Sequence, residues 1–184
     1  MQTLAITMTG IGYTLLLVNH ALLTVLNKPR LGYGLSAVAS TILGIAFVIL
    51  ESLAFVCLNI AWGGIAVYGL YRGPIKTQGS IQTQWCVAIL GLLVLSKACL
   101  VVAGHLEATS WLTLTMSILM FTFLASKSVD RFQYAFFGIA CNLLALPYQL
   151  YIGNISAVPH SAIILLIFVG TLKQYLQLKP ESQR

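Results

Sequence analysis

The chain has 184 residues, of which 59% are hydrophobic and only 8% are charged, and its mean hydropathy is +0.92. A soluble domain carries roughly 25% charged residues, so this composition excludes an ordinary soluble fold. The net charge of +6 does not indicate nucleic-acid binding, because the basic residues are scattered along the chain and form no patch. The sequence therefore predicts an integral membrane protein whose first partner is the lipid bilayer.

We expect this protein to cross the bilayer as helices. Only α-helices and closed barrels satisfy every backbone hydrogen bond inside lipid, and a spanning helix needs about 20 apolar residues. Barrel strands alternate in polarity, whereas residues 42–50 and 162–170 are apolar throughout. The first apolar segment, 4–26, has no basic leader and is long enough to span, so we expect no cleaved signal peptide.

Polar or Gly/Pro breaks divide the chain into seven expected spans. In chain order these are 4–26, 32–50, 52–71, 84–104, 110–125, 132–152 and 157–175. Only Glu51 and Ser52 separate the second span from the third. A six-span arrangement with a re-entrant segment is therefore the alternative.

The distribution of basic residues predicts the orientation, because Lys and Arg favour cytoplasmic loops. With the N-terminus outside and the C-terminus in the cytoplasm, nine of the ten Lys and Arg residues fall on the cytoplasmic side. Glu51 and Glu107 then fall on the outer side. The remaining basic residue, Lys97, lies within the fourth span, where its long stem could let the ammonium snorkel to the outer surface. A buried charge that senses solute or protons is the alternative.

Spans one to three and five to seven begin and end on the same sides, which indicates a parallel internal repeat. A shift of 101 residues pairs Arg30 with Arg131 and Tyr33 with Tyr134 without a gap. Parallel repeats are a known plan of transporters, with the solute site where the repeats meet. The predicted fold is an all-α membrane protein with two three-helix bundles and one linker helix, in the order 3+1+3. The bounds are 1–78 for bundle one, 79–108 for the linker helix, 109–176 for bundle two and 177–184 for a cytoplasmic tail.

Two stretches resemble known families. Asn59-Ile-Ala-Trp-Gly-Gly-Ile-Ala-Val-Tyr-Gly-Leu-Tyr-Arg72 resembles the closing helix of small three-helix bacterial membrane domains of unknown role. Lys127-Ser-Val-Asp-Arg131 and Leu146-Pro-Tyr-Gln-Leu-Tyr-Ile-Gly-Asn154 resemble the YgjV family of bacterial inner-membrane proteins. Both families look like distant relatives of the SWEET, SemiSWEET and PnuC transporters. The Pro-Gln pair that many of those relatives carry in the first helix of a repeat is absent here.

This resemblance implies alternating access of a small polar, uncharged solute, sugar-like or nucleoside-like, between two bundles in a bacterial-type inner membrane. It also implies a cavity contact for the polar residue on the third helix of each repeat, which gives Asn59 and His160, paired by the 101-residue shift. Intramembrane polar groups are costly and need a partner or a cavity. An interhelical hydrogen bond at either residue, or an interfacial position for His160, is the alternative.

Three further residues complete the predicted site. Trp62 lies one turn from Asn59 and could stack on a solute ring or serve only in packing. Asn142 lies in the sixth span with Pro147, which releases a backbone carbonyl and could act as a hinge or give a fixed kink. The predicted substrate-binding residues are Asn59, Trp62, Asn142 and His160, with Pro147 as the hinge.

The sequence carries no sign of an enzyme. The four acidic residues are dispersed and no His/Cys spacing is typical of a metal site, so we expect no catalytic residue, metal or cofactor. The four cysteines lie inside apolar runs as small hydrophobic residues. Tyrosines near the span ends, together with Trp85, suit interfacial aromatic belts, namely Tyr13, Tyr68, Tyr71, Tyr148 and Tyr151. The alternative function is a non-transporting subunit that supports a membrane complex or a homo-oligomer.

Overall fold

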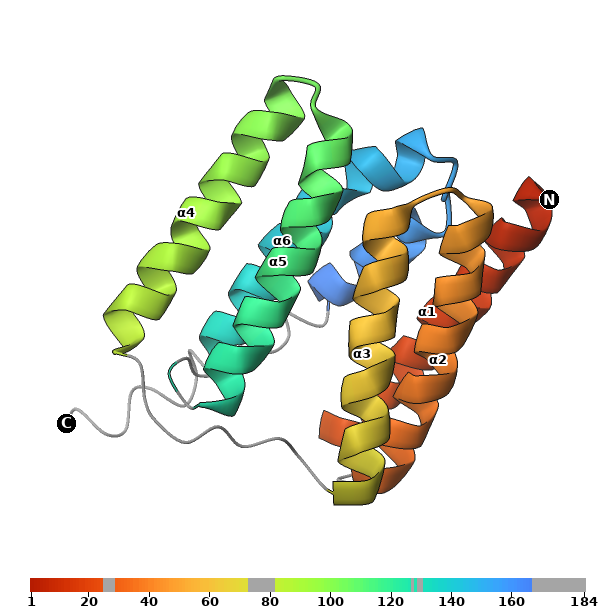
Figure 1. Ribbon diagram of the computed structural model, residues 1–184, viewed down its shortest axis with the longest axis horizontal. Helices are drawn as coiled ribbons and strands as arrows, with labels where there is room; N and C mark the ends of the chain where they lie inside the picture. Colours follow the sequence, from red (N-terminus) through yellow and green to blue (C-terminus); the bar gives the residue numbers. More distant parts are fainter. Residues whose placement is uncertain (25–28, 73–81, 127, 129–130, 167–184) are drawn as a thin grey trace.

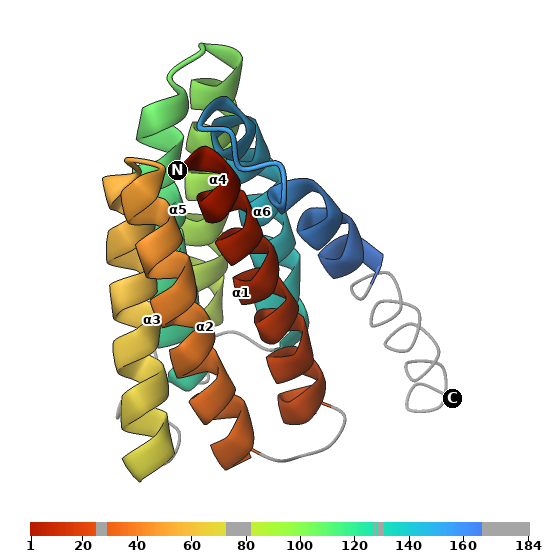
Figure 2. The ribbon, with the colours of Figure 1, turned by 90° about the vertical axis from the view of Figure 1, so that its right-hand side faces the viewer.

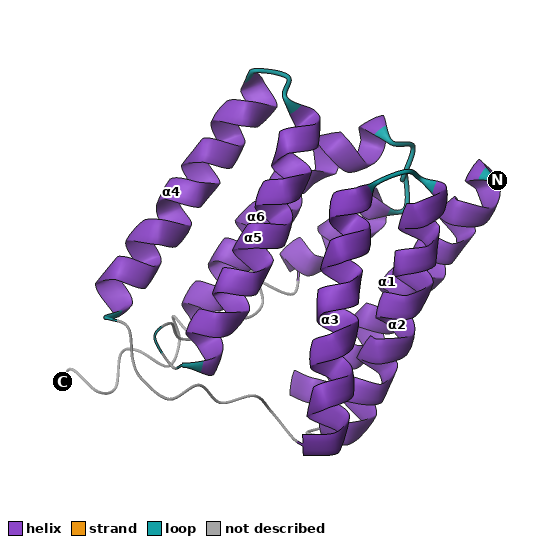
Figure 3. Cartoon of the chain, viewed as in Figure 1, coloured by secondary structure: helices purple, strands orange, loops and turns teal. Residues whose placement is uncertain are grey.

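A computed structural model describes residues 1–24, 29–72, 82–126, 128 and 131–166 (Figure 1). Seven helices and no strand occur in these ranges (Figure 3). The helices are α1 Gln2–Thr24, α2 Pro29–Ile49, α3 Leu53–Arg72, α4 Thr83–Val102, α5 Leu106–Ala125, α6 Arg131–Tyr151 and a terminal helix described over Ala157–Leu166. Each begins within four residues of its expected span.

Four of these helices are long and apolar enough to cross a membrane. They contain the segments Arg30–Ile49, Leu53–Arg72, Thr83–Val102 and Leu106–Phe123. Much of their surface faces outward with large apolar side chains, such as Val48, Ile60 and Leu92, which suits a lipid solvent. The fold is therefore all-helical and compatible with an integral membrane protein.

Three tight turns at one end of the molecule connect successive helices (Figure 1). Each turn has one residue with positive φ, which is Glu51 after α2, Gly104 after α4 and Gly153 after α6. The backbone N–H of the following residue donates to the carbonyl oxygen five residues earlier, in the last turn of the helix, as in a Schellman motif. The three bonds run from Ser52 N to Phe47 O, from His105 N to Leu100 O and from Asn154 N to Gln149 O. The break at Glu51 and Ser52 thus separates two helices that pack side by side.

The helices pack in two groups. In the first group α2 lies between α1 and α3, and α1 approaches α2 closely at Gly12, where an added Cβ would overlap Leu43. In the second group α4, α5 and α6 all contact one another. The helix predicted as a linker, α4, therefore packs directly on its neighbours in the second group.

The helix bounds repeat with the spacing expected from the sequence. Adding 101 residues to α1 gives 103–125 beside α5 at 106–125, and adding 101 to α2 gives 130–150 beside α6 at 131–151. The packing repeats too, because α3 contacts α5 while the terminal helix contacts α1 (Figure 2). We call α1, α2 and α3 the first triplet, and α5, α6 and the terminal helix the second triplet. The last helix of each triplet contacts the first helix of the other.

Two buried clusters form the core. The first cluster joins α4, α5 and α6 and contains Cys86, Leu90, Met116, Met120, Phe123, Phe137 and Cys141. The second cluster lies where the two triplets meet and contains Tyr13, Leu43, Phe47, Phe55, Ala145, Tyr148 and Ala157. We call this second region the junction.

Candidate functional site at the junction of the two triplets

A buried polar network occupies the junction. The Tyr13 hydroxyl on α1 donates to Gln149 Oε1 on α6 at 2.6 Å. Asn154 Nδ2, from the turn after α6, donates to Gln149 Oε1 at 2.7 Å and to the Tyr13 hydroxyl at 3.2 Å. Asn154 is fully buried, and Tyr13 and Gln149 are at most 9% exposed. These three residues therefore connect α1 with α6 and with the turn that follows α6.

The imidazole of His160, on the terminal helix, extends this network by stacking on Tyr13. The two ring centroids are 4.2 Å apart and the planes differ by 13°. Two buried polar atoms, Asn154 Oδ1 and His160 Nδ1, have no hydrogen-bond partner within the described residues. A buried polar atom without a partner costs about 1–3 kcal/mol. Two atoms of the network therefore have unused hydrogen-bonding capacity.

An aromatic layer lies between this network and the α2–α3 turn. Ser52 Oγ and the Tyr148 hydroxyl are 3.1 Å apart and share a hydrogen bond. The Tyr148 ring stacks on Phe55 at 6.0 Å, and Phe55 stacks on Phe47 at 4.7 Å. This layer packs beside the polar network, near the turn between α2 and α3.

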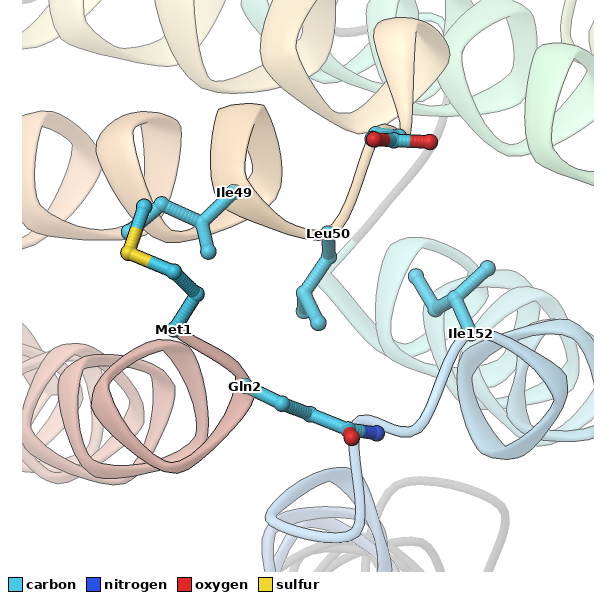
Figure 4. A pocket seen from close by; sticks show the side chains of 6 residues that line it. Met1, Gln2, Ile49, Leu50 and Ile152 are labelled. Carbon is cyan, nitrogen blue, oxygen red and sulfur yellow. The ribbon is translucent and has the colours of Figure 1, made fainter.

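A shallow pocket of about 270 Å³ lies beside this layer, where the start of α1 meets the ends of α2 and α6 (Figure 4). Its lining residues are Met1, Gln2, Ile49, Leu50, Glu51 and Ile152. The Gln2 amide lies against Gly153, directly before Asn154 of the network. The pocket therefore lies close to the polar network along the chain.

The predicted residues on α3 have contacts that favour packing. Asn59 is 7% exposed, and its Nδ2 donates to Phe55 O of its own helix at 2.8 Å. Trp62 meets Phe121 of α5 edge to face, with centroids 5.5 Å apart. Trp62 therefore contributes to the contact between the two triplets.

Asn142 and Pro147 both lie on α6, whereas His160 belongs to the junction network. Asn142 Nδ2 donates to Gly138 O of its own helix at 2.8 Å. Pro147 lies inside α6, directly before the Tyr148 and Gln149 that build the junction. Among the described residues, the hydrogen bonds and ring contacts of the four predicted site residues join none of them to another.

The expectation that Lys97 snorkels is wrong. Lys97 is fully buried, and its terminal nitrogen Nζ contacts α5 and α6. Nζ donates hydrogen bonds to Thr113 Oγ1 and to the Cys141 carbonyl oxygen, so the side chain ends between the helices and does not reach the surface.

The sequence analysis missed three of the four network residues. Tyr13 and Tyr148 were expected in aromatic belts, but both are buried at the junction, whereas Tyr68, Tyr71 and Tyr151 are exposed. Gln149 and Asn154 lie within the YgjV-like segment that follows Pro147. That segment was a usable signal, because two amides beside an intramembrane proline need partners.

The chain matches no family model, and no curated protein or solved structure is similar to it. In the described part of the chain, no three His, Cys, Asp or Glu side chains are placed to hold a metal ion.

Proposed function

We propose that this chain is a transporter or facilitator that moves a small polar, uncharged solute across a bacterial-type inner membrane by alternating access. One observation carries the proposal. Two helix triplets pack reciprocally and meet at a buried polar network, in which Asn154 Oδ1 and His160 Nδ1 have no partner among the described residues. Repeats that meet at a polar site are the plan of many secondary transporters.

The chemistry of the network favours an uncharged solute. A phenol, two amides and an imidazole offer both donors and acceptors, and the described part of the network contains no carboxylate, Lys or Arg. The stacked rings of Tyr13 and His160 form an apolar face beside these polar atoms. Such a combination suits a sugar-like or nucleoside-like molecule, which has hydroxyls on an otherwise flat or ring-shaped body.

Alternating access requires the junction to open first on one side and then on the other. The aromatic layer of Phe55 and Tyr148 closes one end in this arrangement. Rocking of the two triplets about the reciprocal contacts would separate these rings and admit solute from the pocket beside Gln2. Pro147 lies one residue before Tyr148, so bending of α6 there would move the layer.

Cysteine accessibility tests this proposal. We would introduce Asn154→Cys and His160→Cys singly in a background without native cysteines, and treat intact cells with a membrane-impermeant thiol reagent. The matched control is Val158→Cys, which is on the same helix as His160 and 46% exposed on the outer surface of the fold. We expect labelling at 154 or 160 and none at 158, because lipid excludes the reagent from the control.

The outcomes separate the proposal from its rival. Labelling at the junction that a small polar solute slows would support a solute site, and a panel of sugars and nucleosides supplies the probes. If 154 and 160 stay protected in every condition, the transport proposal fails. The chain would then be a structural or assembly subunit, whose outward apolar faces serve partner helices.

A further inference from the structure

Lys97 forms a second buried polar site, within the group of α4, α5 and α6. Its Nζ donates to Thr113 Oγ1 at 2.6 Å and to the Cys141 carbonyl at 2.7 Å, and it lies 3.5 Å from Cys141 Sγ. Thr113 donates its own hydroxyl proton to Thr109 O at 2.9 Å, so it acts as an acceptor toward Lys97. Every one of these contacts is to a neutral group.

No described carboxylate balances a charge at this position. The acidic residues that the structure describes, Glu51 and Glu107, are both exposed, whereas Lys97 is fully buried. Cys141 is the one titratable group that contacts Lys97 from α6. On α4 and α5 and in the turn between them, Cys99, Glu107 and His105 are all exposed, and Cys86 lies three turns away along α4.

The two short contacts fit the two N–H donors of a neutral amine, because both go to oxygen acceptors, Thr113 Oγ1 at 2.6 Å and the Cys141 carbonyl at 2.7 Å. The third contact, from Nζ to Cys141 Sγ at 3.5 Å, is the longest of the three. A protonated lysine in the middle of a membrane helix is costly. The neutral form therefore suits this closed packing.

The same contacts link Lys97 to the helix that builds the junction. Cys141 lies on α6, six residues before Pro147. Movement of α6 away from α4 would break the bond to Cys141 and expose Nζ.

We propose that Lys97 is a proton-exchange site whose occupancy is coupled to the packing of α4 on α6. While the helices are packed, the side chain is an amine held by Thr113 and Cys141. When they separate, the amine takes a proton from hydronium and releases water, and repacking returns the proton. The proposal adds a coupling ion to the proposed transport and rests on it for its biological use, but its test needs no solute.

The protonation state can be observed directly with ¹⁵N-lysine-labelled protein in liposomes. Amine and ammonium Nζ nuclei resonate at different frequencies. We expect one amine signal at pH 8 that is missing from K97M and converts to an ammonium signal on acidification. K97Q gives a second assignment if K97M does not fold. An ammonium signal for Lys97 at every pH, or an amine signal at every pH, overturns the proposal.

The coupling is tested by a distance between α4 and α6. Spin labels on the exposed native Cys99 and on Leu143→Cys, which is 40% exposed, report this separation in a C57A background. We expect the distance to increase over the pH range in which the Nζ signal converts, and to be independent of pH in K97Q. Conversion of the signal without a change in distance overturns the coupling. Absence of solute movement in the same protein would instead count against the transport proposal alone.

Discussion

At the scale of single residues, the junction depends on which polar atoms have partners. Tyr13 connects α1 with Gln149 and Asn154 through hydrogen bonds and with His160 through ring stacking. In a membrane fold, polar contacts between helices contribute about 0.6 kcal/mol on average, with a maximum near 1.7. We expect the contacts of this buried three-residue network to contribute near the upper end of this range, because its members cannot form hydrogen bonds with water instead.

Tyr13→Phe is expected to lower the free energy of unfolding by about 1–2 kcal/mol, because Gln149 and Asn154 each lose a partner in a buried site. The matched control is Thr14→Val. The Thr14 hydroxyl is exposed and bonds only to Gly10 O of its own helix at 2.9 Å, so its loss should change stability by less than about 0.5 kcal/mol. Reversible unfolding in mixed micelles measures both variants. Equal effects would show that the junction network does not contribute to stability.

At the scale of elements, the three tight turns differ in one respect. Gly104 and Gly153 have φ of 78° and 80°, which glycine adopts without strain, but Glu51 has φ of 56°. A residue with a Cβ pays roughly 1–2 kcal/mol in this region. The turn after α2 is therefore under strain that the other two turns avoid, and its carboxylate lies at the edge of the pocket.

Glu51→Gly should therefore stabilise the protein by about 1 kcal/mol, whereas Gly104→Ala should destabilise it by about the same amount. A Cβ added at Gly104 would have no atom within 4 Å, so the loss of stability in Gly104→Ala reports backbone strain alone. Thermal unfolding of the two variants in one detergent checks the pair. A fall in stability for Glu51→Gly would mean that the carboxylate makes a contribution larger than the strain.

At the scale of the whole molecule, the reciprocal packing of the triplets is the feature that function would use. The contact of α3 with α5 is represented by Trp62 and Phe121, and the contact of the terminal helix with α1 by Tyr13 and His160. If the triplets rock against each other, both contacts must change during a transport cycle, since a rigid pair cannot expose the junction alternately.

Two cross-links test this arrangement. Trp62→Cys with Phe121→Cys, and Tyr13→Cys with His160→Cys, should each react with a short bifunctional thiol reagent in membranes, because the native ring centroids are 5.5 and 4.2 Å apart. A protease site inserted between α3 and α4 shows whether the link joins the two triplets of one chain. The control pair, Trp62→Cys with Val158→Cys, places the second cysteine on an exposed surface and should not be linked within a chain. Linking between chains would indicate that the contacts belong to an oligomer.

The sequence by itself determined the helices. Their apolar length and the polar breaks placed the start of each described helix within four residues. The repeat with a 101-residue shift stays a prediction. These features are local, because hydropathy and turn chemistry depend on neighbours in the chain. The helix number and the turn at Glu51 and Ser52 followed from the same information.

Only the tertiary structure decided which polar residues meet. Helices that are apolar on every side have no face that distinguishes lipid from protein, so the sequence did not show that Tyr13 turns inward to Gln149 and Asn154. It also did not show that Lys97 ends on Thr113 and Cys141, because the destination of a long side chain depends on the helices packed around it. Hydrogen-bond partners decide where these buried polar side chains lie, and those partners come from segments distant in the chain.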